Sequence, residues 1–149
     1  MRNYFTNFKT FFESSEEEDN LKETLARLPT SHRKLVKNFS IKLHGGNTLN
    51  NDDQHIGYMS KDKEEIAVAA PWNYGREFAL LHEVGHRVYD TLPPQFKAKW
   101  DHLVKNTVHK FKDHSTEEFF CMMYAQAYSK HQLKEFNIPL LVQFIKSLG

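Results

Sequence analysis

The sequence predicts an α+β fold, in which a small sheet packs against several helices. Two observations predict it. Segments near residues 39–44, 55–59 and 65–69 have the alternation or the short apolar run of a strand, whereas the segments on either side have apolar residues at helical spacing. The predicted order is helices, then an antiparallel or mixed sheet of about three to four strands, then helices again.

The N-terminal part is predicted to be an arm followed by two helices. Residues 1–24 form the arm and the start of the first helix, and residues 25–149 form a single domain. Ser15 precedes three glutamates, a pattern typical of a helix start, because a hydroxyl caps the first turn and acids suit the helix dipole. This helix should end before Pro29, and a short helix should follow over residues 30–37.

The strands lead directly into the most informative helix of the chain. A hairpin formed by residues 55–59 and 65–69 precedes a helix predicted over Glu77–Asp90. Leu81, Val84 and Val88 recur at i, i+3 and i+7, which gives this helix one apolar stripe. Three more helices are predicted over residues 93–109, 115–130 and 133–148.

Composition excludes several classes of function. The net charge is +1 with basic and acidic residues scattered, so nothing indicates nucleic acid or an anionic membrane as a partner. No apolar run approaches the length of a membrane span, and the N-terminus lacks the apolar core of a signal peptide. The single cysteine, Cys121, cannot form an internal disulfide. We expect a monomer, compatible with the cytoplasm or with export from a bacterium.

The pentapeptide His82-Glu83-Val84-Gly85-His86 indicates a metal site. On a helix, positions i and i+4 lie on one face, so His82 and His86 can reach one metal ion. Glu83 points about 100° around the helix, where it can reach a water on that metal. The alternative is a pair of partly buried histidines held by hydrogen bonds.

A third ligand must come from another element. The pattern that adds a glycine and a third histidine is excluded, because Tyr89 and Leu92 stand at those positions. Glu118 is the best candidate from its place at a helix start, but Ser115 and Glu118 also form a capping box, and Glu117 could take either role. Weaker candidates are Asp90, His109 and His114.

Two further motifs resemble a known family. Glu118-Phe119-Phe120, downstream of the histidine motif, and the tract containing Ile138, Pro139, Phe144 and Ile145 are similar to the catalytic domain of anthrax toxin lethal factor and to the Pro-Pro endopeptidases. The resemblance covers roughly residues 25–149 and implies a zincin-like fold of the gluzincin type. It implies that His82, His86 and Glu118 hold Zn²⁺ and that Glu83 is the general base.

The chain departs from that family at two positions. Phe111 stands where the family has a catalytic tyrosine, and Met122 stands where it often has an acid. The missing hydroxyl could be replaced by His109 or His114, or from elsewhere by Tyr58 or Tyr74. Our catalytic candidates beside Glu83 are therefore His114 and Tyr74.

The function predicted from the sequence is that of a zinc endopeptidase. Its substrate would be a protein or peptide, bound extended along a sheet edge that we place at residues 65–69. Two alternatives remain open. One is a degenerate peptidase that keeps zinc and binds a partner without cleaving it, and the other is a metal-free interaction domain with histidines in its core.

Overall fold

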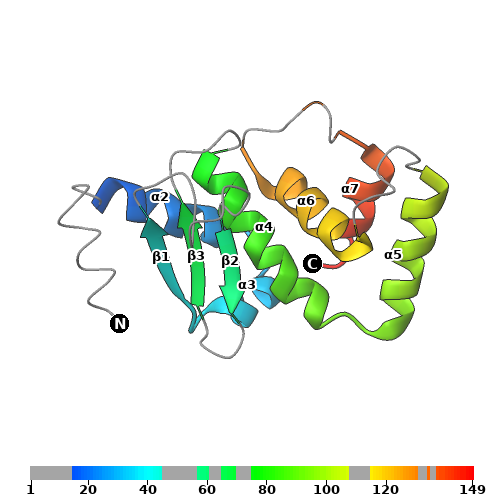
Figure 1. Ribbon diagram of the computed structural model, residues 1–149, viewed down its shortest axis with the longest axis horizontal. Helices are drawn as coiled ribbons and strands as arrows, with labels where there is room; N and C mark the ends of the chain where they lie inside the picture. Colours follow the sequence, from blue (N-terminus) through cyan, green and yellow to red (C-terminus); the bar gives the residue numbers. More distant parts are fainter. Residues whose placement is uncertain are drawn as a thin grey trace.

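The computed structural model describes residues 15–44, 57–60, 65–69, 75–107, 115–130, 134 and 137–149. Within that part the chain forms the helices α2 (Ser15–Ala26), α3 (Thr30–Val36), α4 (Gly75–Asp90), α5 (Pro94–Thr107), α6 (Thr116–Tyr128) and α7 (Pro139–Lys146), and the strands β1 (Ser40–His44), β2 (Gly57–Ser60) and β3 (Glu65–Ala69) (Figure 1). The predicted arm over residues 1–14 lies outside the described residues.

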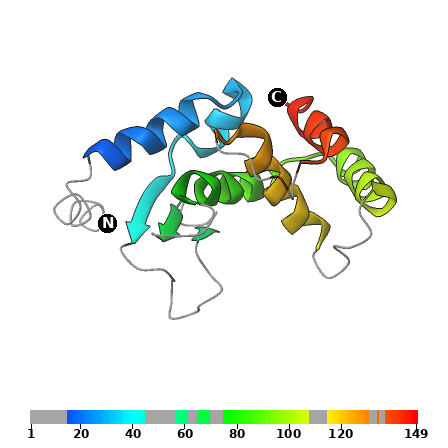
Figure 2. The same ribbon diagram turned by 90° about the horizontal axis from the view of Figure 1, so that it is seen from above.

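Helix α4 is the centre of the molecule. It runs between the strands and α6 (Figure 1), and the view from above places α2 on one side of α4 and the strands on the other (Figure 2). The predicted stripe is confirmed, since Leu81, Val84 and Val88 are all buried. The helix ends at Asp90, and the Thr91 hydroxyl donates a hydrogen bond of 2.8 Å to the Val88 carbonyl.

Helix α6 is buried along most of its length. It packs against α4, and α5 and α7 also contact it. The Trp100 indole of α5 donates a hydrogen bond of 2.8 Å to the Thr116 carbonyl at the first turn of α6. The Trp100 ring also meets Phe120 edge to face and stacks on Phe144 of α7. These aromatic contacts fix where α6 begins, and so they fix the two glutamates of its first turn.

The three strands form one small mixed sheet with the order β1-β3-β2. Strand β1 pairs parallel to β3, with Ser40 opposite Glu65, and β2 pairs antiparallel to β3, with Gly57 opposite Val68. Because β3 lies in the middle, both of its edges are already paired. The prediction that a substrate pairs along residues 65–69 is therefore wrong, and among the described strands β1 and β2 are the outer ones.

The predicted α+β class needs correction, because the core of the described part is helical. The side chains described as buried and apolar lie mostly on the helices and the turns that join them, and Ile66 lies on β3. Six helices build this core around the pair α4 and α6. Local alternation indicates which segments are extended, but the packing layer that forms the core depends on long-range contacts between helices.

Helix boundaries agree with the sequence prediction except near the C-terminus. The last helix was expected over residues 133–148 but begins at Pro139. Ile138, the residue before it, is extended with φ −118° and ψ 94°, as a residue before proline prefers. Proline suits the first turn of a helix but not its interior, so the helix cannot pass through this point. No helix among the described residues is long and apolar enough to cross a bilayer.

Glu77 holds three helices together at the first turn of α4. Its carboxylate accepts hydrogen bonds from the Ser129 hydroxyl at 2.8 Å and the Lys130 backbone N–H at 2.9 Å, both just beyond α6. It accepts a bond from the Thr24 hydroxyl of α2 and pairs with the guanidinium of Arg27, the residue that follows α2. Burial opposes ionisation, but the bonds from Ser129 and Arg27 outweigh it and lower the pKa of Glu77. This carboxylate therefore sets the position of α4 relative to the far end of α6.

We expect Glu77→Gln to lower the free energy of unfolding by about 2 kcal/mol, because it removes the charge that the surrounding donors share. Urea unfolding at neutral pH measures this loss. Glu23→Gln is the matched control, since Glu23 forms an exposed pair with Lys130 and its loss should cost less than about 1 kcal/mol. Equal stability losses in the two variants would contradict the role assigned to Glu77.

Candidate metal centre

His82 and His86 lie one turn apart on α4, on the face that meets the start of α6. Their ring centroids are 5.3 Å apart, and both side chains are about one-fifth exposed, at 17% and 21%. The i, i+4 spacing in the sequence predicted this arrangement. The partial exposure leaves both rings within reach of a solute.

The Glu118 carboxylate bridges the two histidines. One oxygen, Oε1, lies 3.0 Å from His82 Nε2, and the other, Oε2, lies 3.0 Å from His86 Nε2. A metal ion bound by this group would take the place of the protons that these two nitrogens donate to Glu118. The three side chains therefore converge as the sequence predicted, although α6 follows α4 only after another helix.

Glu117 contacts the other side of the same imidazole. Its Oε2 lies 2.9 Å from His86 Nδ1, so the His86 ring is held by a carboxylate at each nitrogen. In metal sites, a carboxylate on the ring nitrogen that faces away from the metal fixes the orientation and the tautomer of the histidine. Glu117 is in position to do this for His86.

The backbone and the side chain of Glu118 make separate contacts in the first turn of α6. The Ser115 hydroxyl caps the helix by accepting a hydrogen bond of 3.0 Å from the Glu118 backbone N–H. The Glu118 side chain contacts the two histidines. The serine cap therefore leaves the Glu118 carboxylate available to the histidine pair.

These contacts shift the pKa values of the site in opposite directions. Burial alone would lower the pKa of His86, but hydrogen bonds with the carboxylates of Glu118 and Glu117 outweigh burial and raise it to about 9. Hydrogen bonds with His82 and His86 hold the pKa of Glu118 far below its usual value. The pair is therefore ionised at neutral pH, and a metal ion must compete with a bound proton.

Cys121 is a further donor that the sequence analysis did not assign. The side chain is fully buried, and its sulfur lies in a group with His82 and His86 whose donor atoms are all within 4.8 Å of one another. Burial raises the pKa of the thiol, and the nearby charge of Glu118 adds to this effect. The structure thus brings together a His82–His86–Cys121 group that could hold a metal ion. The Glu118 carboxylate contacts both histidines of this group.

Gly85 allows the two helices to approach this closely. A Cβ atom at this position would lie 3.0 Å from the Cys121 Cα and 3.2 Å from the Tyr124 Cβ. Glycine in the middle of a helix costs about 1 kcal/mol relative to alanine, so the close approach must compensate for that cost. The glycine of the pentapeptide therefore contributes to the site by bringing α6 to the histidines.

Glu83, the predicted general base, is buried on α4 with 6% of its surface exposed. Its charge contributes to the raised pKa of both His86 and Cys121, so it acts electrostatically within the same site. The other catalytic candidates, His114 and Tyr74, lie outside the described residues. So do Phe111 and His109, as well as the side chain of Tyr58.

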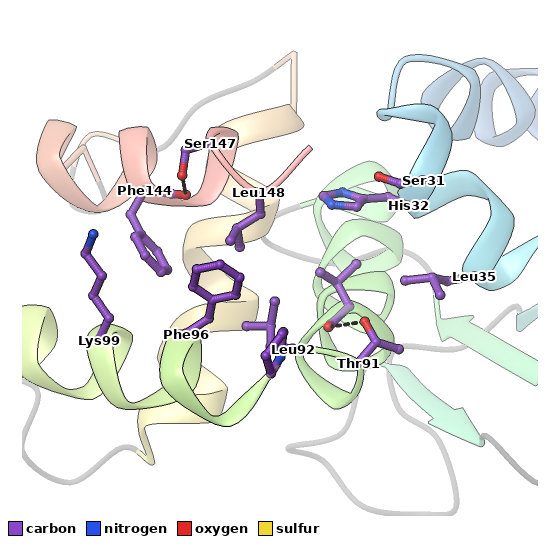
Figure 3. Close-up of a pocket in the computed structure, with 12 residues that line it drawn as sticks. Ser31, His32, Leu35, Thr91, Leu92, Phe96, Lys99, Phe144, Ser147 and Leu148 are labelled. Carbon is purple, nitrogen blue, oxygen red and sulfur yellow. Dashed lines mark hydrogen bonds between the residues drawn. The ribbon is translucent and has the colours of Figure 1, made fainter.

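A separate cavity of about 460 Å³ lies between α3, the end of α4, α5 and α7. Figure 3 shows Leu92, Phe96, Phe144 and Leu148 gathered on one side of it and His32 on the other. The His32 Nδ1 lies 2.9 Å from the Tyr124 hydroxyl, so this histidine is tied to the core. Among the described residues, none of the metal-binding candidates lines this cavity.

No protein-family model, curated protein or solved structure matches the chain. The resemblance to the lethal factor family therefore depends on the quoted motifs alone.

Sequence reasoning did not assign Cys121 as a donor, and it named Glu117 only as an alternative cap or ligand, not as the partner of His86 Nδ1. Cys121 falls three residues after Glu118, so the two share a face of α6. That spacing could have indicated a second donor. The Glu117 contact had a weaker signal, since adjacent glutamates at a helix start are usually explained by the helix dipole.

We expect Gly85→Ala to push α4 and α6 apart and to weaken binding of a divalent metal, because the new methyl group meets the α6 backbone. Isothermal titration with zinc measures the affinity, and urea unfolding measures the stability. Ala98→Gly on the exposed side of α5 is the control: it should cost about 1 kcal/mol through helix propensity and leave the affinity unchanged. An unchanged affinity in Gly85→Ala would contradict the role of the close approach.

We also expect the stability of chelator-treated protein to fall as the pH rises from about 6.5 to about 9. The folded pKa of His86 is raised above 6.5, so its ion pairs stabilise the fold fully below that pH and are lost as the pH passes 9. Urea unfolding across this range should show the decline. His86→Gln should flatten the profile, whereas His102→Gln, at an exposed position on α5, should not.

Proposed function

We propose that this protein is a zinc-dependent endopeptidase. The observation that carries the proposal is the Glu118 carboxylate, which reaches the Nε2 atoms of both His82 and His86 at 3.0 Å. Two imidazoles and one carboxylate are a donor set found in hydrolytic zinc sites, where a further position stays open. Glu117, on the far nitrogen of His86, supplies the orienting contact that such sites require.

Zinc is the metal that this donor set fits best. Imidazole nitrogens, a carboxylate oxygen and a nearby thiol suit a borderline-soft ion with tetrahedral preference, and they do not suit calcium or magnesium, which prefer oxygen donors alone. When bound, zinc would supply a Lewis acid that polarises a peptide carbonyl and acidifies a water molecule.

The chain itself supplies the acid and base chemistry. Glu83 follows His82 directly and lies buried beside the group, where its carboxylate can take a proton from the attacking water and return it to the leaving amine. His82 and His86 would hold the metal, and Glu117 keeps the His86 ring in one orientation. A peptide is the substrate class that the combination of metal donors and adjacent base favours.

A second candidate is a zinc-holding domain that binds a partner without cleaving it. Cys121 favours this alternative, because a thiolate beside two histidines and a carboxylate gives four protein donors, as in closed structural sites. Phe111 also favours it, since the position has no hydroxyl to stabilise an oxyanion.

We expect the purified protein to bind about one zinc ion per chain and to cleave casein or members of a peptide library in a chelator-sensitive manner. Glu83→Gln should retain the zinc and lose cleavage by at least about 10²-fold, because the proton acceptor is removed. Metal analysis and mass spectrometry of the digests measure the two properties.

Glu23→Gln, an exposed change on α2, is the matched control and should keep both zinc and cleavage. Undiminished cleavage by Glu83→Gln would remove Glu83 from the mechanism. Zinc binding without cleavage in the wild type would favour the binding domain, and absence of zinc would contradict both candidates.

A further inference from the structure

Cys121 occupies a place that the proposed mechanism does not use. It is fully buried on α6, three residues after Glu118, and its backbone lies against Gly85 of α4. Gly85 itself sits between His82 and His86 on the helix, so the cysteine is placed beneath the pair of rings. The sequence has no other cysteine, and a disulfide within the chain cannot explain this one.

The distances bring the sulfur within reach of the same metal ion. The donor atoms of His82, His86 and Cys121 all lie within 4.8 Å of one another. Around a tetrahedral zinc with bonds of about 2.0 to 2.3 Å, donor atoms lie about 3.3 to 3.8 Å apart. The donor atoms of this cluster therefore lie within about 1.5 Å of the separations that a shared zinc ion requires.

The two candidate donors of α6, Glu118 and Cys121, differ in solvent exposure. Glu118 is 45% exposed and contacts the outer side of the histidine pair, whereas Cys121 is fully buried below it. The two donors do not exclude one another, since zinc accepts four ligands. Two histidines on α4, with a carboxylate and a thiolate on α6, would complete the tetrahedron.

We propose that Cys121 is a direct ligand of the metal held by His82 and His86, and that its thiolate occupies the position which water needs for hydrolysis. This inference rests on the proposed zinc site, and it adds that Cys121 regulates the access of water to that site. On coordination the thiol releases its proton to solvent as the sulfur–metal bond forms. Water gains access when the sulfur leaves the metal, so the cysteine restrains the peptidase reaction.

Cobalt provides the test, because Co²⁺ replaces Zn²⁺ at such sites and its spectrum reports on the donors. We expect the cobalt-loaded wild type to show visible ligand-field bands of a tetrahedral site and a near-ultraviolet sulfur-to-cobalt charge-transfer band. Since the chain has one cysteine, Cys121→Ser and Cys121→Ala should both lose the charge-transfer band and keep the ligand-field bands. Zinc binding should weaken in both by at least about tenfold.

Peptide cleavage gives the second readout. Cys121→Ala should cleave the same peptide library faster than the wild type, because water takes the released position, and Glu83→Gln in that background should abolish the gain. A cobalt-loaded wild type that has ligand-field bands but no charge-transfer band would overturn the inference and leave the proposed zinc site standing. A wild type that binds neither cobalt nor zinc would overturn both.

Met122→Leu, at the neighbouring position on α6, is the matched control and should retain the charge-transfer band, the zinc affinity and the wild-type cleavage rate. A charge-transfer band that persists in Cys121→Ser, which preserves the size of the side chain, would also overturn the assignment. The presence or absence of the charge-transfer band in the wild type tests the inference without any substitution. Poor folding of a variant therefore does not affect this test.

Discussion

The close packing of α4 against α6 is the contact on which the rest of the structure depends. It exists because Gly85 has no side chain, so that the Cys121 backbone can come against α4. The three side chains of the candidate metal group, His82, His86 and Cys121, come from these two helices, and Cys121 is fully buried. The aromatic contacts of Trp100 at one end of α6 and the hydrogen bonds of Glu77 at the other hold the packing in register.

The local structure of the chain follows from its sequence more closely than its architecture does. The helical stripe of α4 and the cap at Ser115 involve residues within two turns of each other, so periodicity and capping rules find them. The start of the last helix was missed because Pro139 acts through the residue before it. The fold class was wrong because helix packing, which no local pattern encodes, decides what forms the core.

The residues of the candidate metal site also differ in how far the sequence predicts them, according to whether their contacts are local or long-range. His82 and His86 are found from spacing alone, since one helix supplies both. The contacts of the Glu118 side chain depend on the neighbouring helix, so the sequence alone left its role open. Cys121 and Glu117 acquire their contacts through tertiary packing across more than 30 residues of chain, and the sequence offers only weak indications of them.

The contacts of Glu117 and Glu118 with the two ring nitrogens of His86 affect the conformational entropy of the site. An imidazole that is bonded at both nitrogens cannot rotate by 180° about its Cβ–Cγ bond without breaking both contacts. Folding therefore selects one of the two ring orientations of His86. An ion bound by this group would meet a ring whose rotamer is already fixed, so the conformational cost of fixing it would not reduce the affinity.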